Sequence, residues 1–266
     1  MGPAQPPVIT LTTDFGLEDC YVGQLKGALL QGCPAATFVD ITHGIRPWDI
    51  FGAAIAIESS YVFFPPGTVH LVVVDPGVGS ERAILAAQVN EHFFIAPDNG
   101  VLSLVLNGHP GRVYRVDKFQ ARQRKASPTF HGRDIMAPAA CALAQGVSLE
   151  TLGPSVAPAG LVALPAPAQM ANGTTVQTRV QHIDRFGNIR VAFRFDTVSL
   201  NRLAYIEIKG IRLNQMQQSY YEVQAGTLLA LVDSSGYLEI AANQAHAAQL
   251  IDCSIGDPVT IVFHSS

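Results

Sequence analysis

The chain has 266 residues, 48% of them hydrophobic, and carries a formal net charge of −4. This length suits one large domain or two ordinary ones with a sizeable core. Lys and Arg are not clustered, which argues against a nucleic-acid surface and a polybasic membrane anchor, so the expected partner is a small molecule or another copy of the chain.

Strand and helix patterns alternate through the first 160 residues. The run 69–74 is fully apolar, which is typical of a strand buried on both faces. The alternation predicts an α/β domain with a mostly parallel sheet. Strands are predicted at residues 8–12, 37–41, 69–74, 83–89 and 92–96, and helices at 21–30, 48–63, 101–106 and 133–144.

The composition changes after this region. Residues 154–167 are rich in Pro and Ala and suit a linker. Beyond Gly173 the pattern becomes strand-rich, with glycines at the turns, and predicts a small antiparallel barrel or sandwich. We expect an α/β domain at 1–160, a linker at 161–173 and a β domain at 174–266. Strands are predicted at 174–184, 189–195, 205–208, 227–232, 237–241 and 259–263.

The cysteines Cys20, Cys33, Cys141 and Cys253 form no C-x-x-C pair, and no histidine shows metal-ligand spacing. We therefore expect structural thiols, a reducing cytoplasmic environment and no bound metal. Residues 1–7 do not resemble a secretion signal, and the apolar runs are too short to cross a bilayer.

Ligands of open parallel sheets bind beyond the carboxyl ends of the strands. Three charged or glycine-rich segments follow predicted strands there: residues 14–16, Asp40 and residues 75–79. Asp14 stands where a dinucleotide enzyme would carry G-x-G-x-x-G, and a carboxylate repels pyrophosphate but can accept bonds from both ribose hydroxyls. A nucleoside therefore fits better than NAD, although Asp14 could simply cap the next helix.

Asp75 ends the buried strand and Arg82 opens the next one. Gly77 and Gly79 permit a tight turn that folds Arg82 back to Asp75, and a buried carboxylate needs such a partner. The segment lacks the Gly-Lys-Ser/Thr ending of a phosphate loop, and a segment of this kind, taken alone, is more often a structural turn than a catalytic one. His131, in a loop before a helix, joins them only if the fold brings it there.

Two turns in the second half, residues 183–188 and 233–239, read alone as ordinary β-turns. Together with the earlier segments, however, they complete a series of motifs. In order these are ITLTTDFG (9–16), VDITHGI (39–45), VVDPGVGSER (73–82), APDNGVL (96–102), TFHGRD (129–134), HIDRFGN (182–188) and DSSGYLEIAAN (233–243). The series resembles the S-adenosylmethionine hydroxide adenosyltransferases, the adenosine-forming S-adenosylmethionine hydrolases, over nearly the whole chain.

The resemblance implies an N-terminal α/β/α sandwich, a C-terminal β-barrel and a homotrimer whose ligand lies between the first domain of one subunit and the second domain of its neighbour. It implies hydrolysis of S-adenosyl-L-methionine by in-line attack of water on the ribose C5′ carbon. The substrate is a small molecule, and neither a cofactor, a nucleic acid nor a membrane is involved.

The resemblance also implies roles for individual residues. Asp75, Arg82 and His131 correspond to the residues that grip the water. The expected substrate-binding residues are Asp14 at the ribose diol, Trp48 near the ribose and methionine, Phe186 at the adenine, Asn188 at the nucleoside, Ser234 at the methionine end, Glu239 and the backbone near Ala241 by the adenine, and Asp184 in the same turn as Phe186.

Two alternatives remain open. Halogenases of the same fold share Asp14, Trp48 and the Phe-Gly-Asn turn, but they carry an extra loop in the first domain and lack the Asp-Arg-His set. A non-catalytic sensor of S-adenosylmethionine or nucleoside is the other alternative, against which the complete set argues. A dehydrogenase is disfavoured because the glycine fingerprint is missing.

Overall fold

The computed structural model describes residues 6–107, 109, 111–117, 126–165 and 173–264. The chain divides into two compact units, Met1–Leu164 and Pro165–Ser266. Of the linker expected at 161–173, residues 166–172 lie outside the described residues. Within the described part, no helix has the length and apolar character to cross a membrane.

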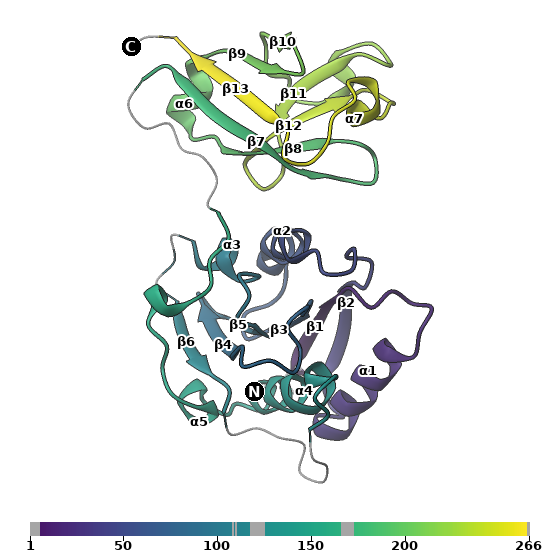
Figure 1. Ribbon diagram of the computed structural model, residues 1–266, viewed down its shortest axis with the longest axis vertical. Helices are drawn as coiled ribbons and strands as arrows, with labels where there is room; N and C mark the ends of the chain where they lie inside the picture. The colour runs from purple at the N-terminus through teal and green to yellow at the C-terminus, as the bar shows by residue number, and fades with distance from the viewer. Residues whose placement is uncertain (1–5, 108, 110, 118–125, 166–172, 265–266) are drawn as a thin grey trace, which may run out of the picture. The chain divides into compact units, whose positions relative to one another are not determined.

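The first unit contains a six-stranded sheet in the order β2-β1-β3-β5-β4-β6 (Figure 1). Strands β2, β1, β3 and β5 run parallel, and β4 is antiparallel to both β5 and β6. The predicted mostly parallel sheet is confirmed. The strands are β1 (Val8–Thr13), β2 (Thr37–Thr42), β3 (Val69–Val73), β4 (Ile84–Val89), β5 (His92–Pro97) and β6 (Arg112–Arg115).

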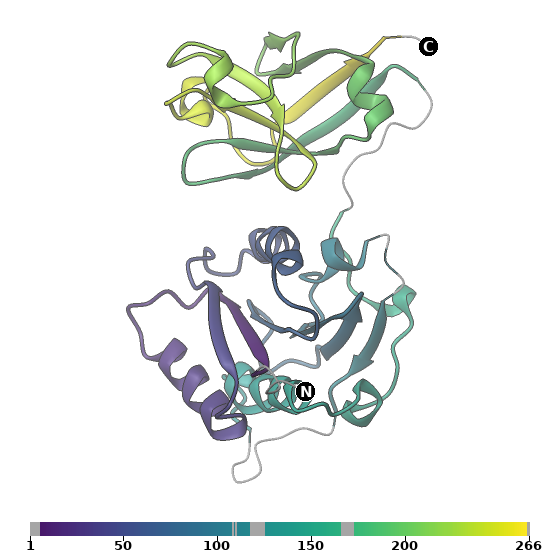
Figure 2. The same cartoon turned by 180° about the vertical axis from the view of Figure 1, so that it is seen from behind.

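Helices cover both faces of this sheet, as the two opposite views show (Figures 1 and 2). The helices are α1 (Tyr21–Gly32), α2 (Ile50–Ser60), α3 (Ser103–Leu106), α4 (Ala137–Ala144) and α5 (Leu149–Leu152), with short turns η1 (Tyr61–Phe63), η2 (Gly132–Met136) and η3 (Pro158–Gly160). Leu71 and Val73 of β3 pack with α1 and α4, whereas Val72 and Val74 pack with α2 and α3. Alternate residues of one strand thus serve two cores, which makes the unit an α/β/α sandwich.

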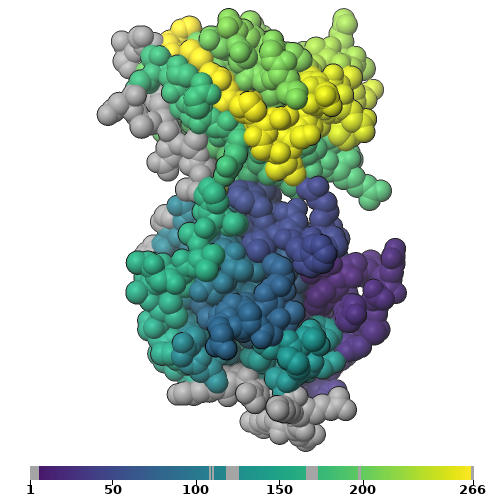
Figure 3. Space-filling view, viewed as in Figure 1, coloured from purple at the N-terminus to yellow at the C-terminus, as the bar shows by residue number. Residues whose placement is uncertain are grey.

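On one face of the sandwich α1 and α4 lie side by side, and Figure 3 shows them as neighbouring purple and teal surfaces. Helix α1 buries Val22, Leu25 and Leu29, a helical spacing. The thiols of Cys33 and Cys141 meet there at 2.7 Å. Cys253 is also buried, whereas Cys20 is exposed.

The second unit contains a seven-stranded antiparallel sheet in the order β10-β9-β13-β7-β8-β12-β11. It curls around one apolar core as a nearly closed barrel, which confirms the predicted small antiparallel β domain. The strands are β7 (Thr175–Ile183), β8 (Ile189–Arg194), β9 (Leu203–Ile208), β10 (Ile211–Leu213), β11 (Leu228–Val232), β12 (Tyr237–Ala242) and β13 (Pro258–Phe263), with α6 (Thr197–Asn201), η4 (Tyr220–Glu222) and α7 (Ala247–Leu250) between them.

Candidate active site

The carboxyl ends of β1 and β3 lie next to each other in the first unit. Thr13 of β1 is in register with Val73 of β3, and the strands are parallel. Asp14 and Asp75 therefore leave the sheet at the same edge, where ligands of such sheets bind. Asp40 differs from the expectation, because it lies inside β2 rather than beyond it.

Asp75 and Arg82 form a bidentate ion pair at this edge. Arg82 Nε donates to Asp75 Oδ1 at 2.7 Å, and Arg82 Nη2 donates to Asp75 Oδ2. Only 9% of the Arg82 side chain and 6% of the Asp75 side chain are exposed. The two hydrogen bonds give both side chains the partners that polar groups need in such a buried position.

His131 completes the set predicted from the sequence. Its Nδ1 atom lies 3.1 Å from Arg82 Nη2. Because a guanidinium only donates, Nδ1 must be the acceptor, and the proton of neutral His131 is then on Nε2. Burial lowers the pKa of His131, and the positive charge of Arg82 lowers it further. The imidazole is thus held neutral, with an Nε2–H available to a ligand or water.

Two glycines let these segments approach each other. Gly79, at φ +83°, lies so close to Pro128 that a Cβ atom would come within 2.5 Å of the Pro128 carbonyl oxygen. A Cβ on Gly132 would come within 2.7 Å of Val73 at the end of β3. The loop carrying His131 therefore packs directly on the turn and the strand that carry Asp75.

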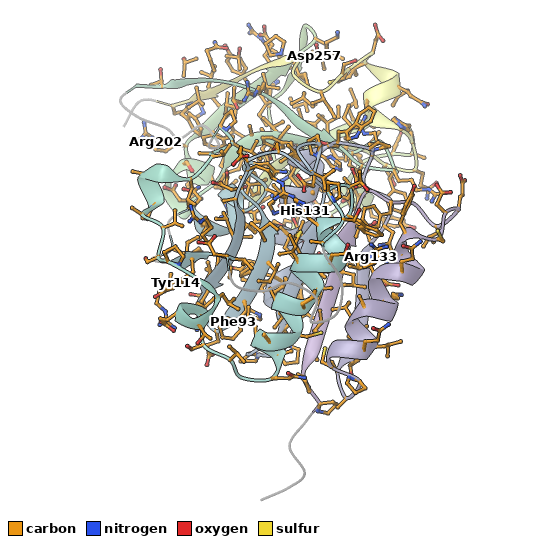
Figure 4. The ribbon with its side chains drawn as sticks, turned by 60° about the horizontal axis from the view of Figure 1, so that its bottom comes forward. Phe93, Tyr114, His131, Arg133, Arg202 and Asp257 are labelled. Carbon is orange, nitrogen blue, oxygen red and sulfur yellow. The ribbon has the colours of Figure 1, made fainter. Side chains whose placement is uncertain are left out.

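The end of β3 and the start of α4 are fixed by further polar contacts. Asn99 Nδ2 donates to the Val74 carbonyl at 2.9 Å, just before Asp75. Asp134 accepts the Ser127 N–H at 2.9 Å and pairs with Arg133. Figure 4 shows His131 at the start of the teal helix, with Arg133 on the side of α1. The APDNGVL and TFHGRD motifs thus hold the backbone on both sides of the candidate site.

An aromatic cluster joins the Asp14 loop to the His131 loop. The rings of Phe15, Tyr21 and Phe130 contact one another with centroid distances of 5.6 to 5.8 Å. The Arg133 guanidinium lies 4.8 Å from the centroid of Phe130. Phe15 follows Asp14 and Phe130 precedes His131, so this packing sets the separation of the two functional side chains.

Asp14 accepts the backbone N–H of Trp48 at 2.9 Å through Oδ2. Trp48 has a left-handed φ of +67° and is 73% exposed. Burial raises the pKa of Asp14, the Trp48 bond opposes this, and the charge of Asp75 adds to it. The helix predicted from residue 48 begins only at Ile50, because Trp48 has a left-handed backbone conformation and Asp49 caps the helix by accepting the N–H of Gly52.

The second unit contains two turns built in the same way. Asp184 Oδ1 accepts the N–H groups of Phe186 and Asn188, both at 2.9 Å, and Asp184 Oδ2 accepts from Asn188 Nδ2. Asp233 Oδ1 likewise accepts the N–H groups of Ser235 and Tyr237. The Asp184 carboxylate therefore holds its turn in shape, while the Phe186 ring at the turn remains 77% exposed.

The remaining predicted contacts also lie in this unit. Ser234 is exposed in the Asp233 turn. Glu239 of β12 accepts a hydrogen bond from the Tyr220 hydroxyl at 2.7 Å. Burial raises the pKa of Glu239, and the negative charges of Asp184 and Asp233 raise it further. Ala241 is a fully buried member of a small apolar cluster.

Several residues of the site were missed by sequence reasoning. Phe130 and Gly132 lie inside a motif that was noted only for His131, and Tyr220 lies in a segment for which no element was predicted. Phe15 directly follows Asp14, so its position was the available signal. Among the residues that the structure describes, no group of three or more His, Cys, Asp or Glu is arranged to hold a metal ion.

Comparison of the sequence with known proteins shows that both units match domains of one family. Residues 9–153 match the profile of the SAM hydroxide adenosyltransferase N-terminal domain, and residues 178–260 match that of the C-terminal domain. Proteins named (R)-S-adenosyl-L-methionine hydrolase from Salinispora tropica and Thermus thermophilus are each 35% identical to the chain. These alignments cover 97% and 96% of this chain and 98% and 99% of the relatives.

Two further relatives also match nearly the whole chain. A fluorinase from an Actinoplanes species is 26% identical over 96% of this chain and 97% of its own. The crystal structure of an uncharacterized conserved protein from Thermotoga maritima superposes with a TM-score of 0.86 at 32% identity, over 96% of this chain and 99% of that one. With both of its domains matched, this chain belongs to the SAM hydroxide adenosyltransferase family.

Proposed function

We propose that this protein hydrolyses S-adenosyl-L-methionine to adenosine and L-methionine. The observation that carries the proposal is the hydrogen-bonded set of Asp75, Arg82 and His131 at the sheet edge where Asp14 also emerges. Asp14 holds the ribose hydroxyls, and the other three residues hold the attacking water. The names of the relatives support this substrate, and they specify its (R) form.

The reaction requires little from the protein beyond positioning the substrate and the attacking water. Water oxygen bonds to the ribose C5′ carbon as the C5′–S bond breaks, and methionine leaves as a neutral thioether. No general acid and no redox or metal cofactor is required for that departure. Holding a nucleophile in line can supply roughly 7–11 kcal/mol of the barrier.

The water must also lose a proton. A carboxylate has about four lone-pair sites, and Arg82 occupies two of those on Asp75, so Asp75 can still accept a bond from water. His131 Nε2–H and the Arg82 guanidinium orient the water oxygen and stabilise its developing hydroxide character. The proton passes to Asp75 as the new C–O bond forms.

Turnover tests this proposal directly. We expect incubation with S-adenosyl-L-methionine to release adenosine and methionine in equal amounts, measured by chromatography, with faster turnover of the (R) form. In oxygen-18 water the label should enter the adenosine 5′ hydroxyl. Bound but unreacted substrate would instead identify a sensor.

A halogenase is the alternative to water attack. The fluorinase relatives raise it, but β4 begins at Ile84, only two positions after Arg82, and leaves no room for an added loop there. The complete Asp75-Arg82-His131 set also favours water. Formation of a 5′-halogenated adenosine in fluoride or chloride at a rate equal to hydrolysis would reverse this choice.

We further propose that the protein is a cytoplasmic homotrimer with its active sites at the subunit interfaces. The resemblance to the family implies this assembly, and the exposed rings of Trp48 and Phe186 are surfaces that a ligand or a neighbouring subunit would cover. Light scattering during size-exclusion chromatography should give three times the mass of one chain. Elution as a monomer would contradict the proposal.

The aromatic cluster leads to a first prediction about the site. Phe130→Leu should lower the melting temperature and reduce kcat by roughly tenfold, because small displacements of a catalytic group cost up to about 10²-fold. The matched control is Phe63→Leu, since Phe63 is exposed and lies outside the cluster. Equal kcat values for the two variants would show that the cluster does not position His131.

A further inference from the structure

His43 occupies the carboxyl end of β2, beside the Asp14 loop. It is buried, and it follows the β2 residue Thr42, which is in register with Thr12 of β1. The motif VDITHGI contains it, but the water-holding set does not use it. Its surroundings connect it to the loop that carries Asp14.

A directed series of polar contacts runs through His43. Lys26 Nζ donates to Asp40 Oδ2 at 2.7 Å, and Asp40 Oδ1 lies 3.1 Å from His43 Nε2. His43 Nδ1 lies 2.8 Å from Thr13 Oγ1. Although burial alone would raise it, contacts with Lys26 and His43 hold the pKa of Asp40 below its ordinary value.

The direction of each bond follows from an ionised Asp40. In the neutral imidazole the nearby carboxylate favours the tautomer with its proton on Nε2, and Nδ1 is then the acceptor. The Thr13 hydroxyl therefore donates to Nδ1, and its oxygen remains free to accept the N–H of Phe15 at 3.3 Å. The His43 carbonyl accepts the N–H of Gly16 at 2.8 Å.

These contacts reach both sides of Asp14. Thr13 precedes Asp14, and Phe15 and Gly16 follow it, so His43 fixes the backbone from which the Asp14 carboxylate projects. We propose that His43 is a positioning residue for Asp14 and, through it, for the ribose end of the substrate. The inference rests on the proposed function, because it gives Asp14 the ribose hydroxyls.

Two substitutions separate this role from simple packing. In His43→Asn the amide oxygen replaces Nδ1 and keeps an acceptor for Thr13, whereas in His43→Gln the terminal amide replaces Nε2 and keeps a partner for Asp40. We expect His43→Gln to raise KM and the adenosine Kd roughly tenfold, the equivalent of about 1.4 kcal/mol, with kcat within about threefold of wild type. His43→Asn should restore the adenosine Kd to within about threefold of wild type.

The measurements are steady-state kinetics, and calorimetric titration with adenosine. Equal impairment of the two variants, unchanged adenosine affinity in His43→Gln, or a fall in kcat as large as the rise in KM would each overturn the inference. If His43→Gln does not fold, Thr13→Val removes the same hydrogen bond and should show the same rise in Kd. Wild-type protein that binds adenosine but releases none from S-adenosyl-L-methionine would refute the proposed function, while the Kd series would still test His43.

Discussion

Asp75→Asn should reduce kcat for S-adenosyl-L-methionine hydrolysis by about 10²–10⁴-fold, the usual range for removing a group that takes a proton in the transition state. The amide keeps the size of the side chain but cannot accept a proton from water. It also loses the charge that pairs with Arg82, whose side chain is buried. The adenosine Kd should change little, because the substitution leaves Asp14 and the turns at Asp184 and Asp233 unchanged.

The control for this variant comes from the same turn. Glu81 is an exposed carboxylate next to Arg82, and Glu81→Gln should keep wild-type kcat. Breaking a buried ion pair can cost about 3–5 kcal/mol, so thermal unfolding must show that Asp75→Asn is folded at the assay temperature. A folded Asp75→Asn enzyme with kcat within tenfold of wild type would remove Asp75 from the mechanism.

The Asp75–Arg82 pair could be predicted because it is local. The partners are seven positions apart in the sequence, a glycine-containing turn joins them, and a buried carboxylate needs a counterion. The apolar run of β3 likewise predicted a strand that is covered on both faces. Motif order then indicated the fold of both units, which the structure confirms.

The position of His131 beside this pair could not be predicted from the sequence pattern alone. It lies 49 residues from Arg82, and its place depends on the close packing of Gly132 against Val73. The left-handed Trp48 and the edge strand β6 were missed for a related reason. Each depends on tertiary contacts, with Asp14 in one case and with β4 in the other, which override local preference.

A buried histidine pair in the first unit should make the protein sensitive to acid. His70 of β3 is fully buried, with Nδ1 at 2.7 Å from Thr10 Oγ1 and Nε2 at 3.3 Å from His92 Nδ1. The ring stacks on Phe94, with centroids 5.0 Å apart. Burial, with a smaller effect of His92, lowers the pKa of His70 to about 3.

The sign of the effect follows from proton binding. Between about pH 3 and 6.5 an unfolded His70 is protonated and the folded one is not, so the free energy of unfolding falls as the pH falls through this range. One such group lowers the free energy of unfolding by about 1.4 kcal/mol for each pH unit below 6.5. Above pH 6.5 its stabilising contribution is fully present. Burial lowers the pKa of His92 too, which acts in the same direction.

His70→Asn isolates this contribution. Its amide oxygen can still accept from Thr10, but it does not titrate. We expect the loss of unfolding free energy between pH 7.5 and pH 5.0, measured by urea denaturation with circular dichroism, to be smaller in the variant than in wild type by about 2 kcal/mol. The exposed His109 provides the matched control, since His109→Asn should leave the wild-type pH dependence unchanged. An equal loss in wild type and His70→Asn would mean that His70 is not the acid-sensitive group.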